Sequence, residues 1–197
     1  MKLKQINNII SIAIIVSLIL LVILVGSVIV KLTSEVKATA TIDTIENYHY
    51  ILTDNDTDYF KKTFKELKQV LKEEVNEEEY AKTISKLFII DFYSLSTSVN
   101  KNDVGGVQFV KEDYRDTFIK IAKDSIYNSV ENNIYGDRKQ KLPTVTNVEV
   151  TNISKEKDDY IVTCSITYEE NMGYASSVEI NIIKRDNILE ISSLKEM

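Results

Sequence analysis

The sequence predicts an α+β protein in which an N-terminal transmembrane helix precedes three helices and an antiparallel curved sheet. Three observations lead to this fold class. An uncharged apolar run fills residues 6–30, apolar residues recur at helical spacing over residues 60–134, and apolar and polar residues alternate over residues 145–192. The chain has 197 residues with five Gly and one Pro, which suits one folded domain after the apolar run and leaves few flexible linkers.

The N-terminal apolar run is long enough to span a lipid bilayer. No Asp, Glu, Lys or Arg occurs between Lys4 and Lys31. About 20 apolar residues at ~1.5 Å each cover a hydrocarbon core of ~30 Å, and the backbone in lipid must satisfy its own hydrogen bonds. We therefore expect a helix at residues 9–31 that contacts membrane lipid directly.

The expected topology is single-pass in the cell membrane. Residues 1–8 form a short cytoplasmic tail, and residues 32–197 form an extracytoplasmic domain, because the leader is tiny and the following domain is large. The alternative is a signal peptide cleaved after Ala40. The apolar run is longer than the roughly 7–15 residues of a signal peptide, and charged residues separate it from Ala40, which favours an uncleaved anchor.

Alternating and helical patterns divide the domain into elements. Alternation over residues 36–52 predicts a strand, broken near residues 43–47. Amphipathic helices are then predicted at 60–75, 80–95 and 114–134, with a short extended stretch at 107–110 between the last two.

The C-terminal third predicts four strands joined by short linkers. Short linkers favour an antiparallel meander whose one face lies on the helices. The strands are centred on residues 148–150, 160–168, 178–182 and 189–191.

Cysteine and histidine usage excludes several kinds of site. One Cys, Cys164, cannot form an internal disulfide or a thiolate metal cluster, and one His, His49, cannot form a multi-histidine metal site. The pattern places Cys164 on a core face and His49 on an exposed face. We expect no cofactor, no metal and no enzymatic activity, because no paired catalytic motif is present.

Charge indicates that the domain does not bind nucleic acid directly. Of the 24 basic residues, three lie in residues 1–32, so the remaining 165 residues carry 21 basic and 30 acidic side chains. An acidic domain without a basic stripe is a poor partner for phosphate backbones.

Asp91 is the most unusual acidic residue. It lies seven residues after Ile84 and four before Leu95, which places it on the apolar stripe of a predicted helix. A buried carboxylate needs a partner or becomes protonated. We expect Asp91 either to bind a backbone amide or an arginine, such as Arg115 or Arg138, or to serve a pocket.

A small basic loop contains Arg138, Lys139 and Lys141 beside the only proline, Pro143. The simpler interpretation is solvation of the loop. The alternative is contact with an acidic partner or with membrane headgroups. The pair Gly105–Gly106 lacks the pattern of a phosphate-binding loop and predicts a turn.

The order of an anchor, three helices and an antiparallel sheet resembles the bitopic assembly proteins of type IV secretion and conjugation machines, of the VirB-eight type. This resemblance covers nearly the whole chain, and it rests on topology and not on a residue motif. It implies a cone-shaped soluble domain with a nuclear-transport-factor-like fold. It also implies scaffolding without catalysis, with other envelope or channel subunits as partners.

Three functional hypotheses follow, and the third is an enzyme on the same scaffold, which would need a second polar group close to Asp91 or His49. The first is a non-enzymatic, membrane-anchored assembly component of a cell-envelope machine, which is expected to be homo-oligomeric through its helix–sheet surface or its anchor. The second is a membrane-tethered ligand-binding or sensory domain with a pocket on the concave sheet near Asp91. A sealed concave face would favour assembly, and a deep pocket with Asp91 and a tyrosine pointing into it would favour ligand binding.

Overall fold

The computed structural model describes most of the chain after residue 38. The described residues are Ser17, Leu21, 39–72, 74–133, 135–170 and 172–197. The chain divides into two compact units, one formed by Thr39–Asn133 with Asp137–Met197 and the other by Met1–Ala38 with Ile134–Gly136. All the helices and strands named below belong to the first of these units.

No helix among the described residues is both long and apolar enough to cross a membrane. Apart from Ser17 and Leu21, the predicted segment 9–31 lies outside the described residues, as does the predicted tail at 1–8. The membrane anchor therefore stays a prediction.

Helices α2 (Asp58–Val70) and α3 (Glu77–Tyr93) begin where side chains cap them. The hydroxyl of Thr57 accepts a hydrogen bond from a backbone N–H in the first turn of α2 at 3.1 Å. The side-chain oxygen of Asn76 accepts two such bonds in α3, both at 3.1 Å. Three glutamates in the first turn of α3 also favour the positive end of the helix dipole. Both helices agree with the sequence prediction.

The third helix is shorter than the sequence predicts. Helix α4 spans Arg115–Asp124 and does not continue to residue 134. The backbone leaves the helical region at Ser125, with φ −118° and ψ −108°, and a 3₁₀ turn at Ile126–Ser129 follows. Ser125 also hydrogen-bonds its hydroxyl to the carbonyl of Ile121 at 2.7 Å, a local bond that competes with continuation of the helix.

The stretch 107–110 is not extended as predicted. Val107–Phe109 forms a 3₁₀ turn, because Gly106 adopts a left-handed φ of 77° and accepts the hydrogen bond of the Phe109 N–H at 3.0 Å. Similar short turns occur at Glu46–Tyr48, Leu95–Thr97 and Glu112–Tyr114.

The predicted meander is confirmed as a four-stranded antiparallel sheet in the order β3-β4-β5-β6. Its strands are β3 (Val145–Glu156), β4 (Asp159–Tyr168), β5 (Ser177–Arg185) and β6 (Ile188–Glu196). The first and last hairpins are tight, and each contains a residue with positive φ, Lys157 at 59° and Asp186 at 55°. The described domain is therefore α+β.

The predicted first strand is a hairpin in the structure. Strand β1 (Thr41–Ile45) pairs antiparallel with β2 (Tyr50–Thr53), and the turn between them uses His49 at a φ of 58°. Both strands have alternating patterns of the same parity, so the sequence does not reveal the reversal of direction between them. His49 is exposed, as predicted.

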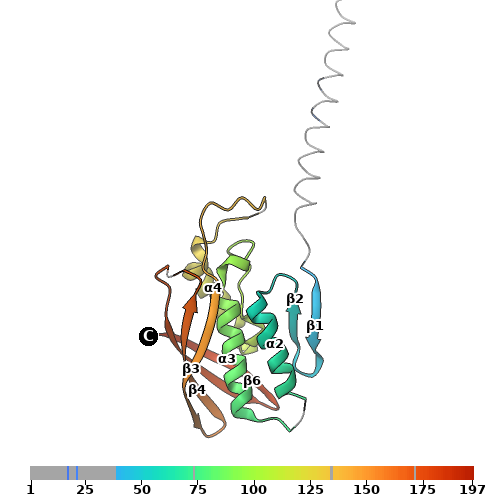
Figure 1. Ribbon diagram of the computed structural model, residues 1–197, viewed down its shortest axis with the longest axis vertical. Helices are drawn as coiled ribbons and strands as arrows, with labels where there is room; N and C mark the ends of the chain where they lie inside the picture. The colour runs from blue at the N-terminus through green and yellow to red at the C-terminus, as the bar shows by residue number, and fades with distance from the viewer. Residues whose placement is uncertain (1–16, 18–20, 22–38, 73, 134, 171) are drawn as a thin grey trace, which may run out of the picture. The chain divides into compact units, whose positions relative to one another are not determined.

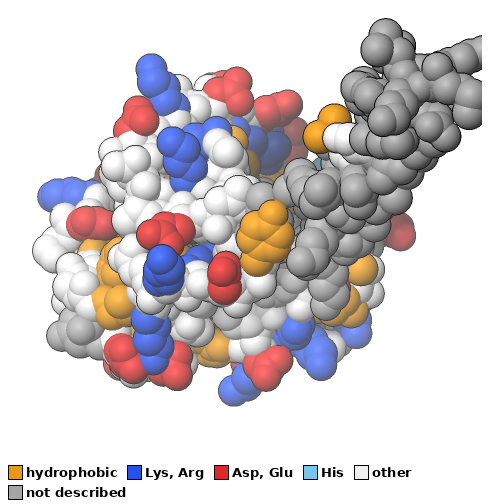
Figure 2. Space-filling model, turned by 90° about the horizontal axis from the view of Figure 1, so that it is seen from above, with side chains coloured by type: hydrophobic (Ala, Val, Ile, Leu, Met, Phe, Trp, Pro, Cys, Tyr) orange, Lys and Arg blue, Asp and Glu red, His pale blue; other side chains and the backbone are white. Residues whose placement is uncertain are grey.

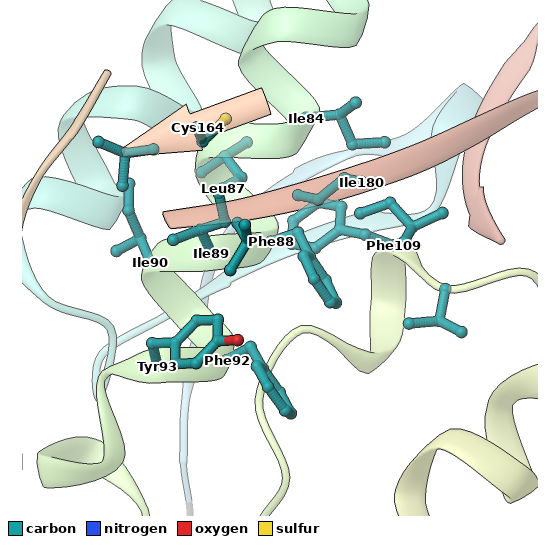
Figure 3. Packing of buried hydrophobic residues seen from close by; sticks show 14 of the residues in the cluster. Ile84, Leu87, Phe88, Ile89, Ile90, Phe92, Tyr93, Phe109, Cys164 and Ile180 are labelled. Carbon is teal, nitrogen blue, oxygen red and sulfur yellow. The ribbon is translucent and has the colours of Figure 1, made fainter. Parts of the chain in front are cut away.

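Helix α3 forms the centre of the core. It is buried on nearly all sides and contacts β3, β4 and β6, while α2 packs beside it (Figure 1). Figure 3 shows its apolar side chains, among them Ile84, Leu87 and Phe88, gathered near Ile180 of β5 and Phe109. Cys164 is completely buried in this core, and burial raises the pKa of its thiol to about 12, so it is an unreactive core residue as predicted.

Side chains and a neighbouring segment cover parts of the exposed strand edges. The Tyr59 hydroxyl accepts the Val148 N–H of β3 at 3.0 Å, and a bulge interrupts β3 between Val150 and Asn152. The Gln108 side chain accepts the Ile51 N–H at 2.8 Å and donates to the Ile51 carbonyl at 3.2 Å, as a neighbouring strand would. These contacts reduce the backbone surface that another chain could pair with.

The visible surface carries both signs of charge. On the face in Figure 2, Lys and Arg side chains alternate with Asp and Glu side chains over the described part of the domain. No broad area of one sign gathers on this face.

Candidate functional site

A cavity of the described domain lies between α4 and the sheet. It has a volume of about 430 Å³, within the range of about 300–1,000 Å³ that is typical of small-molecule sites. We call it the α4–β6 cavity. Its lining comes from α3, α4, β6, the turns around α4 and the β4–β5 loop: Phe88, Phe92, Val110, Tyr114, Phe118, Ile121, Ala122, Ser125, Ile126, Gly173, Tyr174, Ala175, Ile191, Ser193, Leu194 and Glu196.

Three phenylalanine rings form one wall of the α4–β6 cavity. Phe88 and Phe92 lie one helical turn apart on α3, with their rings stacked at a centroid distance of 5.6 Å. Phe118 of α4 packs on both, at 5.8 Å from Phe88 and 5.1 Å from Phe92. Figure 3 shows Phe88 and Phe92 side by side on α3. Because these rings support one another, the wall is preformed, although each ring is buried, with at most 7% of its surface exposed.

The mouth of the cavity also exposes apolar surface. Ile121 of α4 lines the cavity and is 54% exposed, and Tyr174 of the β4–β5 loop is partly buried. The Tyr174 ring packs against Tyr168 at a centroid distance of 6.2 Å, and the Tyr168 hydroxyl donates to the Ala175 carbonyl at 2.8 Å. These contacts hold the loop at the rim.

One carboxylate marks the polar end of the cavity. Glu196 pairs opposite the buried Val178 in the sheet, so its side chain lies on the face that the helices cover. The Tyr93 hydroxyl donates a hydrogen bond to Glu196 Oε1 at 2.9 Å. Burial and the negative charge of Glu196 raise the pKa of both Tyr93 and Tyr168 well above the usual value, so both phenols stay protonated.

Asp91 does not line the α4–β6 cavity. It is partly buried near the end of α3, where its Oδ2 accepts the Gly106 N–H at 2.7 Å. Of the predicted partners, the structure therefore shows a backbone amide and neither Arg115 nor Arg138. Asp91 lines a separate, polar hollow of about 290 Å³. This hollow is formed beside the β1–β2 hairpin and the loop at 103–108, and not by the four-stranded sheet on which the sequence predicted a pocket.

Asp91 has an unusual protonation equilibrium. Burial raises its pKa to about 7, the Gly106 hydrogen bond lowers it in part, and the nearby carboxylates of Asp56 and Asp103 raise it further. Burial also raises the pKa of Asp56, whose Oδ2 accepts the Thr53 N–H at 2.5 Å. The hydrogen bonds made by Asp56 and Asp91 fix turns of the chain, so the two carboxylates that line this hollow have a structural role.

The glycine pair beside Asp91 allows a close approach of two segments. A Cβ on Gly105 would lie 2.3 Å from the Asp91 backbone oxygen, and one on Gly106 would lie 2.8 Å from the Phe88 ring. The Gly105 N–H also donates to the Tyr127 hydroxyl at 3.0 Å. The predicted turn is thus a loop that fits tightly against the end of α3.

The three basic residues of the predicted partner surface differ in their contacts. Arg138 donates to the Ser98 carbonyl and to the Val99 carbonyl at 3.4 Å, and so joins its loop to the segment after α3. Lys141 forms an ion pair with Glu170, and Lys139 is exposed. Contact of these residues with a partner stays a prediction.

Sequence reasoning missed the α4–β6 cavity and the position of Glu196. The lining residues lie on segments more than 100 positions apart, and each apolar stripe by itself predicts only core packing. The one signal available was Ile121, which widens the apolar stripe of its helix beyond what packing requires.

No protein-family model, curated protein or solved structure matches this chain. The function is therefore argued from the chemistry of the residues.

Proposed function

We propose that this chain is a non-enzymatic binding protein whose α4–β6 cavity takes an apolar small molecule. The observation that carries this proposal is a cavity of about 430 Å³ with a mostly apolar lining, in which the exposed Ile121 lies beside the buried rings of Phe92 and Phe118. Transfer of apolar ligand surface from water to such a lining is favourable by about 25 cal/mol per Å².

Binding without turnover fits the residues around the cavity. Among the described lining residues, Glu196 is the one carboxylate, and none is Lys, Arg, His or Cys. General acid–base or nucleophilic catalysis needs a second positioned group. The hydroxyl of Tyr93, which contacts Glu196, stays protonated because its pKa is raised.

The proposal also includes a membrane anchor and a nuclear-transport-factor-like fold for the domain. The uncharged run at residues 9–31 supports a single-pass tether with the domain outside the cytoplasm. Helices on one face of a curved antiparallel sheet, with a cavity between them, support a cone-shaped, nuclear-transport-factor-like domain. The ligand would then be sensed or held at the outer face of the cell membrane.

A second candidate is the assembly component of a conjugation or type IV secretion channel. The observation that favours it is the order of elements, in which three helices are followed by an antiparallel meander. Crosslinking of the full-length protein in native membranes, followed by mass spectrometry, tests this candidate. Recovery of channel subunits or homo-oligomers would support it, and recovery of the monomer alone would contradict it.

The ligand proposal is tested by photolabelling of the full-length protein in a non-ionic maltoside detergent. The probe is an uncharged dodecyl alcohol with a diazirine in its chain, and labelled peptides are identified by mass spectrometry. We expect labels on peptides from α4 and β6. Labels spread evenly over the surface of the domain would refute the proposal.

Two exposed isoleucines provide a matched pair of variants. Ile121→Asp places a charge at the mouth of the cavity, and Ile42→Asp places the same charge on the β1–β2 hairpin. The two side chains are 54% and 56% exposed, so neither change should unfold the protein. We expect Ile121→Asp to reduce cavity labelling at least about tenfold, because about 1.4 kcal/mol changes an affinity tenfold, and Ile42→Asp to leave it unchanged.

A further inference from the structure

The described lining of the α4–β6 cavity carries negative charge and no positive charge. Glu196 is the charged residue of the described lining, and it makes no ion pair with any described residue. Arg115 lies next to the lining residue Tyr114 in sequence, but its Nε donates to the Val110 carbonyl at 2.9 Å. The cavity therefore presents a negative group without a neutralising partner in its wall.

Glu196 is exposed at the rim of the cavity, and the Tyr93 hydroxyl orients its carboxylate. The bond from the Tyr93 hydroxyl uses Oε1, and within the described part of the chain Oε2 has no hydrogen bond. Strand pairing opposite Val178 fixes the side of the sheet from which the carboxylate projects. One oxygen is thus oriented and the other is available to a ligand.

Tyrosines lie near this carboxylate, since Tyr93 donates its hydroxyl to it and the charge of Glu196 acts on Tyr168. The Tyr93 ring packs edge-on against Phe92 at a centroid distance of 4.9 Å, and Tyr174 lines the rim near Tyr168. The faces of aromatic rings attract cations, and ring surfaces combined with a carboxylate are a recurring arrangement for ammonium groups. A fatty-acid anion would instead place its charge beside Glu196.

We propose that the ligand of the α4–β6 cavity is an amphiphile with an apolar body and an ammonium head, and that Glu196 binds the head. This inference rests on the proposed function. The apolar body lies against Phe92, Phe118 and Ile121, and the ammonium group lies beside Glu196 Oε2 and Tyr174 at the rim.

Three photoreactive probes with the same dodecyl diazirine chain test the inference on the full-length protein in maltoside detergent. One carries a trimethylammonium head, one a hydroxyl and one a carboxylate. Labelling of the α4 and β6 peptides is divided by labelling of the β3 peptide, which corrects for unequal partitioning into detergent. We expect about tenfold more cavity labelling by the ammonium probe than by the carboxylate probe, which corresponds to about 1.4 kcal/mol.

Two glutamine variants locate the effect. Glu196→Gln removes the charge but keeps an acceptor for the Tyr93 hydroxyl, and it should abolish the preference for ammonium. Glu179→Gln removes one charge from the opposite face of the sheet, where Glu179 lies across from Lys195 in the strand register, and this variant should keep the preference for ammonium. Circular dichroism verifies that both variants fold.

The outcomes separate this inference from the function on which it rests. If the hydroxyl probe labels the cavity but the head group makes no difference, or the carboxylate probe labels more, the ammonium inference is wrong and the apolar site stands. If Glu196→Gln keeps the preference, Glu196 is not the binding group. If even the hydroxyl probe fails to label the cavity, both proposals are wrong.

Discussion

Replacing Asp91 by Asn should change how the stability of the protein depends on pH. Burial raises the Asp91 pKa from 3.8 to about 7, so the folded protein binds this proton more tightly than the unfolded chain. Between about pH 4 and 7 the folded state therefore carries more protons, and the free energy of unfolding falls as pH rises. Three pKa units at about 1.36 kcal/mol each give an upper limit of about 4 kcal/mol.

The assay is urea denaturation of the full-length protein, followed by far-UV circular dichroism, at several values of pH from 4 to 8. The wild-type protein should lose stability from pH 4 to about 7, and its stability should then reach a plateau above about pH 7. Asp91→Asn keeps an oxygen that can accept the Gly106 N–H but cannot ionise, so its stability should fall less. Part of the slope should remain, because burial also raises the Asp56 pKa.

Asp124→Asn serves as the control, because this aspartate is exposed at the end of α4. It should retain the wild-type pH dependence. If Asp91→Asn and the wild-type protein lose stability equally between pH 4 and 8, then Asp91 is ionised in the folded state throughout, and its burial does not control its pKa.

Three further changes test other contacts by denaturation. Gly106→Ala should lower the free energy of unfolding by at least about 2 kcal/mol more than Gly173→Ala does. Both have left-handed φ, 77° and 80°, but a Cβ meets the Phe88 ring at 2.8 Å in the first and nothing within 4 Å in the second, so equal losses would contradict the steric argument. Tyr127→Phe leaves a partly buried N–H of Gly105 and a buried C=O of Phe92 without their hydroxyl partner and should lower the free energy of unfolding by about 2–3 kcal/mol. Two lysines lower the Glu77 pKa from 4.5 to about 2, so the stabilisation by Glu77 is present above pH 4.5 and is lost as the pH falls toward 2. Glu77→Gln should reduce the loss of stability between pH 4.5 and 2. An unchanged loss would show that the ion pairs of Glu77 do not contribute significantly to stability.

Local patterns predicted the elements that depend on local physics. Helices α2 and α3 follow from apolar spacing and from the caps Thr57 and Asn76, and the meander follows from short linkers between alternating segments. Asp91 stood out because a carboxylate on an apolar stripe needs a partner. Its partner, Gly106, could not be identified, since loop geometry depends on how the chain packs.

The remaining differences have tertiary causes. The turn at His49 reverses the chain without glycine or proline, so alternation on both sides resembled one strand. Helix α4 ends at Asp124 although apolar spacing continues to residue 134, because the chain turns at Ser125. The α4–β6 cavity depends on how α4 lies over β6, and no single segment of sequence determines this arrangement.

The loop at residues 105–108 is connected to three parts of the chain that are far apart in sequence. Its hydrogen bonds reach Asp91, Tyr127 and Ile51, at separations of 15, 22 and 57 residues. The loop can complete these bonds only after α3, the turn at Tyr127 and the β1–β2 hairpin have all assembled, and contacts at such separations form slowly. Cleavage of this loop by a protease would therefore report cooperative opening of the whole domain, although the loop lies outside the α-helices and strands.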